Sequence, residues 1–155
     1  MEKDTVIKKY FRMAMIISGV IIGSLLVYLM VVEIFRVKLS PFTGCVELSN
    51  PQSIRYIFYL AAALQIVFIR LLRGLLLRAK STDSEEKLVL KLFRVSIMTS
   101  VLAEVPALVG LALFFLGGFN SDFYVLLFVS FLLMFMFFPR KNNWKAWIKK
   151  HLEYS

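Results

Sequence analysis

The chain has 155 residues, 59% of them apolar, and its mean hydropathy is +0.75. Soluble domains usually carry about 45 to 50% apolar residues, so this composition excludes an ordinary soluble domain and indicates an integral membrane protein. The formal charge is +9. Basic residues beside anionic lipid headgroups account for this charge, and a nucleic-acid partner is not needed to explain it.

Four segments are apolar enough to cross a bilayer. A span of about 30 Å requires about 20 helical residues, because each residue rises about 1.5 Å. Residues 13–32 carry no charge, and residues 95–119 carry a single acid, Glu104. Residues 56–69 and 123–138 are shorter, but flanking arginines can extend their side chains to the interface. We predict transmembrane helices at about residues 11–34, 54–73, 94–118 and 122–138.

The basic residues predict the orientation. Of the 19 Lys and Arg residues, only Arg36, Lys38 and Arg55 fall on the side of the first and third connections. Cytoplasmic segments of membrane proteins are enriched in Lys and Arg. We therefore expect a multi-pass protein of a cell membrane with both termini in the cytoplasm.

The predicted fold is all-α, a polytopic four-helix transmembrane bundle made of two helical hairpins in a single domain over residues 1–155. After Pro139, residues 140–155 form a tail in which tryptophans share one helical face and lysines lie elsewhere, as in helices that lie at the membrane interface. We expect anionic headgroups to contact this tail and the end of the second span. The residues expected at the interface are Arg70, Arg73, Arg78, Trp144, Lys145, Trp147, Lys149 and Lys150.

A polar centre is predicted near the middle of the membrane. Glu104 lies about 15 Å along its helix from Arg94, and Gln65 and Ser130 reach a similar depth from their own flanking arginines. Burial in hydrocarbon favours a neutral carboxyl or one that binds a cation. Pro106 has no N–H, so the carbonyl of Leu102 becomes a free acceptor nearby. The centre is a structural hydrogen-bonded strut, a proton or sodium site, or a site that binds a partner subunit or a lipid.

Small residues predict two helix-packing faces. The third span has a seam of small residues spaced three and four apart, which lets a neighbouring helix approach closely in lipid. The first span carries Gly19 and Gly23 in a GxxxG motif, which fits packing inside the bundle as well as dimerisation. The seam of the third span consists of Ser96, Ser100, Ala103, Ala107 and Gly110.

The stretch Ala103-Glu104-Val105, followed by Ala107-Leu108 and Gly110-Leu111, resembles the ion-carrying helix of rotor-ring proteolipids, the c subunits of rotary ATPases. The resemblance implies that Glu104 carries a proton or sodium ion reversibly. In two-hairpin proteolipids the carboxylate lies on the second helix of a hairpin, whereas Glu104 lies on the first. The wider pattern of four spans, the last rich in Phe, resembles small bacterial inner-membrane proteins of no assigned function. This likeness implies the fold and a location in the bacterial inner membrane.

The sequence offers few groups for catalysis. It has one His, one Cys and 10 acidic residues, and it lacks a metal-spaced cluster, a nucleophile motif and a phosphate-binding loop. We predict no enzyme activity, no catalytic residue, no metal and no cofactor. The first hypothesis is a non-enzymatic membrane protein with a protonated Glu104 that forms homo-oligomers or serves as an accessory subunit of a larger membrane complex. The second is a proton- or sodium-translocating element that uses Glu104 as its carrier.

Overall fold

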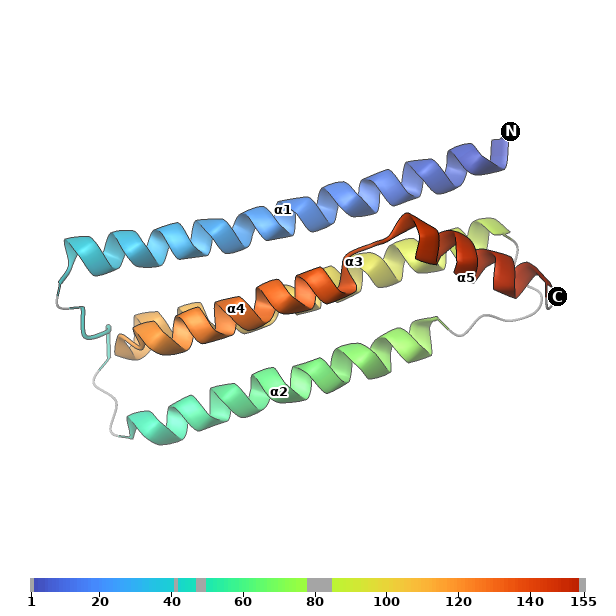
Figure 1. The fold of residues 1–155 in the computed structure, drawn as a ribbon. Helices are drawn as coiled ribbons and strands as arrows, with labels where there is room; N and C mark the ends of the chain where they lie inside the picture. Colours follow the sequence, from blue (N-terminus) through green and yellow to red (C-terminus); the bar gives the residue numbers. More distant parts are fainter. Residues whose placement is uncertain (1, 41, 47–49, 78–84, 154–155) are drawn as a thin grey trace.

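The computed structural model describes residues 2–40, 42–46, 50–77 and 85–153, and within these ranges it is all-α. Four helices are long and apolar enough to cross a membrane, which confirms the predicted fold class and an integral membrane protein. Each of the four is at least as long as the span predicted for it, and the tail forms a fifth helix (Figure 1). The helices are α1 (Glu2–Lys38), α2 (Pro51–Leu76), α3 (Glu85–Gly117), α4 (Asn120–Phe137) and α5 (Lys141–Glu153).

The central helix of the bundle is α3. It packs most extensively against α4, with α1 on one side and α2 on the other (Figure 1). The predicted second hairpin is therefore a packed pair, whereas the first is open, because its two helices lie on either side of α3. Both ends of the chain lie at the end of the bundle where α2 connects to α3.

Close contact between α3 and α4 is possible because α3 presents small residues there. Ala103 and Ala107 are fully buried. At Gly110, an added Cβ would lie 3.0 Å from Cβ of Leu126 and 3.2 Å from Cα of Phe123. Lipid tails are as apolar as the side chains, so van der Waals contact of this kind, rather than the hydrophobic effect, holds such helices together.

The connection between α1 and α2 covers the end of α3. The N–H of Cys45 donates to the carbonyl of Phe115 at 2.8 Å, and the N–H of Val46 donates to that of Leu116 at 3.1 Å. The last carbonyls of a helix have no partner within it, so these bonds satisfy groups that would otherwise need water. Gly118 ends α3 in the left-handed region, with φ of 68°, as many helices end.

The tail helix α5 is docked on the bundle. Trp144 is only 4% exposed and meets the ring of Phe11 edge-on, with centroids 5.5 Å apart. Ile148 is also buried, in the same cluster of side chains from α1 and α3. The indole of Trp144, expected to face lipid headgroups, is thus enclosed by protein, while Trp147 remains half-buried.

We predict that Gly118→Ala destabilises the protein. The new Cβ would lie 2.7 Å from the carbonyl oxygen of Phe42, and alanine disfavours the positive φ. The cost should be about 1 to 3 kcal/mol, which lowers the midpoint of thermal unfolding in detergent by several degrees. Gly74→Ala is the control, because nothing lies within 4 Å of an added Cβ there. An equal effect of the two substitutions would contradict the fit of the connection against α3.

Candidate functional site

The turn of α3 around Pro106 joins three helices. The proline has no N–H to bond the carbonyl of Leu102, and its ring crowds that carbonyl. The amide Nε2 of Gln65, on α2, donates to the Leu102 carbonyl instead. One residue after the proline, the N–H of Ala107 donates to Oγ of Ser130 on α4, at 2.8 Å. Side chains of α2 and α4 therefore form hydrogen bonds with the backbone of α3 at the turn where Pro106 interrupts the bonds within the helix.

Glu104 joins the same turn of α3 to α1. The hydroxyl of Tyr28 donates to Oε1 of Glu104 at 2.6 Å, and Oγ of Ser24 lies 2.5 Å from the same oxygen. Oγ of Ser24 also lies 2.7 Å from the carbonyl oxygen of Ile21. Tyr28 and Ser24 are four residues apart, so both lie on one face of α1. The hydrogen bonds of Glu104 thus run to α1, whereas Gln65 and Ser130 meet α3 beside it.

A second contact between α1 and α3 lies about one turn away. The hydroxyls of Ser18 and Ser100 are 2.9 Å apart, and both residues are buried. Hydrogen bonds between helices in a membrane contribute about 0.6 to 2 kcal/mol each, so these contacts fix the inner face of α1 on α3. Ser100, Ala103, Ala107 and Gly110 are all buried, and Ser96, the fifth residue of the predicted seam, is half-buried.

The GxxxG motif of α1 lies outside these contacts. A Cβ added at Gly19 or Gly23 would meet nothing within 4 Å. Of the two uses that the sequence left open, packing of the two glycines inside the bundle is therefore not observed.

An ion pair that sequence analysis missed joins Arg55 of α2 to the buried Asp122 of α4. Nε of Arg55 lies 2.8 Å from Oδ2 of Asp122 and Nη2 donates to Oδ1 at 2.9 Å, while the hydroxyl of Tyr59 donates to Oδ1 at 2.7 Å. The side chain of Asp122 is only 4% exposed. Paired, two-pronged contacts between arginine and carboxylate are among the stronger hydrogen bonds in proteins. The sequence did contain a signal for this ion pair, because Arg55 and Asp122 carry opposite charges and flank the second and fourth spans at the same end.

A third polar cluster joins α1 to α4 at that end. The hydroxyl of Tyr124 donates to Oε1 of Glu33 and accepts a bond from Nη1 of Arg36 at 3.1 Å. Arg36 and Glu33 also form an ion pair at 3.6 Å. Each transmembrane helix is thus tied to another by at least one polar contact.

The residues expected at the interface lie at the opposite end. Arg70 is exposed, and Arg73 lies with Cζ 5.5 Å from the centroid of the Phe137 ring. Lys145, Lys149 and Lys150 are exposed on α5. Arg78 lies outside the described residues.

Within the described ranges, no group of three or more His, Cys, Asp or Glu side chains is placed to hold a metal ion. No known protein family, curated protein or solved structure matches the chain. Function therefore has to follow from how the residues described above are placed.

We predict that the cost of Gln65→Leu depends on Pro106. In the native chain the substitution removes the donor to the Leu102 carbonyl and should cost about 1 kcal/mol. In Pro106→Ala, the N–H of the new alanine can bond that carbonyl, so Gln65→Leu should cost less, with a coupling energy of about 1 kcal/mol. Unfolding of the native chain, the two single variants and the double variant in mixed micelles measures this coupling energy. Equal costs in both backgrounds would show that the amide does not serve the proline break.

Proposed function

We propose that the protein is a non-enzymatic integral membrane protein that self-associates through the open face of α1, with Glu104 as a neutral strut that fixes the inner face of that helix. The open face comprises Ile16, Gly19, Val20, Gly23, Val27 and Met30, which all lie within one-third of the helix circumference. The observation that carries the proposal is the empty space at Gly19 and Gly23, where an added Cβ has no neighbour within 4 Å.

The shape of the open face suits pairing of helices in lipid. Two glycines one turn apart leave a shallow groove, and Ile16, Val20 and Val27 border it. Small residues let helix backbones approach closely, and β-branched side chains lose little rotamer freedom when they pack. Val20 is 67% exposed within the chain, so most of its surface is left for contact with lipid or with another helix.

The opposite face of α1 supports the same proposal, because it holds the helix in a fixed rotation. Leu25 and Ser18 are buried there, and Ser24 and Tyr28 contact Glu104. A fixed rotation keeps Gly19 and Gly23 directed away from the bundle, so the groove is preformed and pairing requires no rearrangement of α1.

Proton counting supports the neutral form of Glu104. Oγ of Ser24 has two close oxygen neighbours, Oε1 of Glu104 and the carbonyl of Ile21, but its hydroxyl has a single proton. If the carboxyl of Glu104 donates to Ser24 and Ser24 donates to Ile21, both contacts become hydrogen bonds. An ionised carboxylate would leave one of them as a contact between two oxygens without a proton.

The orientation belongs to the same proposal. We place the end that carries both termini in the cytoplasm, because most Lys and Arg residues lie there. The likeness to small bacterial inner-membrane proteins makes the membrane a bacterial inner membrane in this proposal. Anionic headgroups of that leaflet are then the neighbours of Arg70 and of the lysines of α5. Cys45 lies at the other end, where it is exposed.

We expect Gly19→Leu and Gly23→Leu to reduce self-association. The large side chain fills the groove that the second copy would occupy, but it meets no atom of its own chain. Cys45 is the single cysteine and is exposed, so it accepts donor and acceptor dyes at one position. Energy transfer between labelled copies in vesicles, measured as the protein is diluted with lipid, reports the association.

Gly74→Leu is the matched control, because Gly74 is an exposed helical glycine on α2 with the same empty surroundings. The native chain and this control should show equal transfer above the level of random encounter, and both α1 variants should fall towards that level. Transfer at the random level in the native chain would reject self-association and favour an accessory subunit whose partner is another protein.

We expect Glu104→Gln to be tolerated and Glu104→Ala to destabilise. The amide oxygen can take the place of Oε1 and accept from both Tyr28 and Ser24. Alanine leaves Tyr28 without its acceptor and Ser24 with the carbonyl of Ile21 alone, at a cost of about 1 to 3 kcal/mol. The carboxyl C=O infrared band, assigned with Glu104→Gln, should stay unchanged from roughly pH 5 to 10 and on addition of sodium. Thermal unfolding in detergent measures the first effect in the same preparations.

The partial exposure of Glu104 favours a second candidate function, a proton- or sodium-translocating element. Tyr28 and Ser24 are hydroxyls that can pass a proton to and from the carboxyl. In that case the infrared band of Glu104 titrates or responds to sodium, and Glu104→Gln loses transport while keeping its stability. The same measurement therefore decides between the strut and the carrier.

A further inference from the structure

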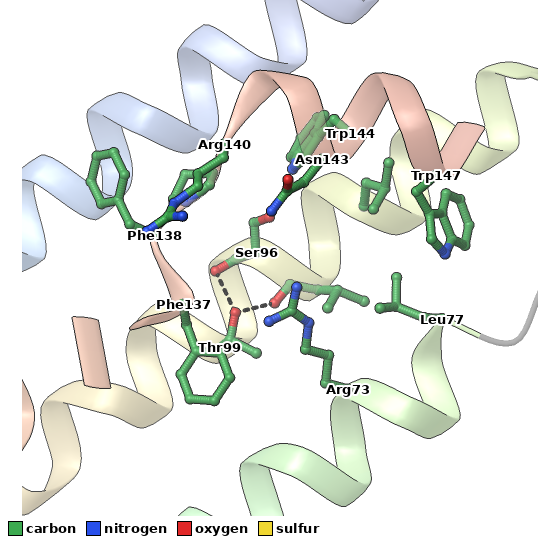
Figure 2. Close-up of a pocket in the computed structure, with 13 residues that line it drawn as sticks. Arg73, Leu77, Ser96, Thr99, Phe137, Phe138, Arg140, Asn143, Trp144 and Trp147 are labelled. Carbon is green, nitrogen blue, oxygen red and sulfur yellow. Dashed lines mark hydrogen bonds between the residues drawn. The ribbon is translucent and has the colours of Figure 1, made fainter. Parts of the chain in front are cut away.

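A cavity of about 150 Å³ lies at the end of the bundle that carries both termini. It is enclosed by the last turn of α2, the first half of α3 and the connection between α4 and α5 (Figure 2). Its walls are partly apolar, with Leu77, Leu92 and Phe137 among them. Arg73 extends into it from α2, and Arg140 lines its edge from the α4–α5 connection, beside Phe138.

The two arginines are available to a ligand. Cζ of Arg73 is held 5.5 Å from the centroid of the Phe137 ring, which keeps the half-buried guanidinium at the cavity. Arg140 is exposed at the opening. In the part of the chain that the structure describes, neither arginine has a carboxylate within 4.0 Å. Two positive charges that border one cavity without a counterion favour an anion there.

The other polar groups of the cavity fit the same ligand. The hydroxyl of Thr99 donates within α3, to the carbonyl of Val95 at 2.7 Å, so that carbonyl oxygen already has a partner. Asn143 adds an amide from the first turn of α5, whose positive dipole end lies at the cavity.

We propose that this cavity binds a phosphate group, with Arg73 and Arg140 as its ligands. Guanidinium groups match phosphate oxygens with paired hydrogen bonds, and the apolar wall at Leu77 and Phe137 can take the first carbons of a chain attached to that phosphate. The phosphate is supplied either by the headgroup of an anionic phospholipid or by a soluble phosphate compound. This proposal does not depend on self-association or on the state of Glu104.

The test is binding to the full chain in detergent, with phosphatidylglycerol, phosphatidylcholine, glycerol phosphate and inorganic phosphate as probes. Native mass spectrometry counts the bound molecules, and the unfolding midpoint reports their stabilisation. We expect one tightly bound phosphatidylglycerol, with affinity lowered about tenfold in Arg73→Gln and in Arg140→Gln, because each loses charge-assisted bonds to the phosphate. Arg73→Lys, which keeps the charge but not the paired donors, should lose less.

Arg70→Gln is the matched control, because it removes the same charge one turn earlier on α2 from an exposed side chain outside the cavity. Protection by phosphatidylglycerol alone assigns the phosphate to a lipid, and protection by glycerol phosphate or inorganic phosphate as well assigns it to a soluble compound. Equal losses in Arg70→Gln and Arg73→Gln would overturn the proposal in favour of diffuse surface charge, as would the absence of binding. Arg140 is exposed, so Arg140→Gln keeps the test decisive if Arg73→Gln fails to fold.

Discussion

The bundle depends on one constraint, which is that hydrocarbon offers no water to a backbone group that lacks a partner. Pro106 creates such a group in the middle of α3, and the chain answers it with the amide of Gln65. Ser130 takes the neighbouring N–H of Ala107, and Glu104 attaches the same turn to α1. A break that would weaken an isolated helix therefore becomes the place where all four membrane helices are held in register. This accounts for a proline and an acid two residues apart in an otherwise apolar helix.

Depth along the membrane could be predicted from the sequence, but rotation about each helix could not. The constant rise of an α-helix placed Gln65, Glu104 and Ser130 at a similar level, and Gln65 and Ser130 do meet α3 within one turn of Pro106. Ser24 and Tyr28 were not predicted as the partners of Glu104, because they can be recognised as such only when α1 is known to face α3. The pairing of Asp122 with Arg55 was missed for the same reason.

Neighbours in the bundle are also not set by order in the chain. The predicted class and four spans required only composition, length and charge, which are properties of each segment by itself. That α1 and α2 flank α3 depends on contacts between segments, since α3 carries the small residues and the polar turn that both of them use. The tail illustrates the same limit. An amphipathic face with Trp144 suits a lipid surface and a surface of other helices equally well, and here Trp144 packs against side chains of α1 and α3.

The connection between α1 and α2 has a consequence for the way the chain is assembled during synthesis. Its N–H groups at Cys45 and Val46 are bonded to the last turn of α3, which is translated some 70 residues later in the order of the sequence. Until α3 has entered the membrane, this connection and the amide of Gln65 lack their partners. The first two helices therefore lie in the bilayer as separate segments at first. The bonds of their connection and of Gln65 form when α3 inserts between them.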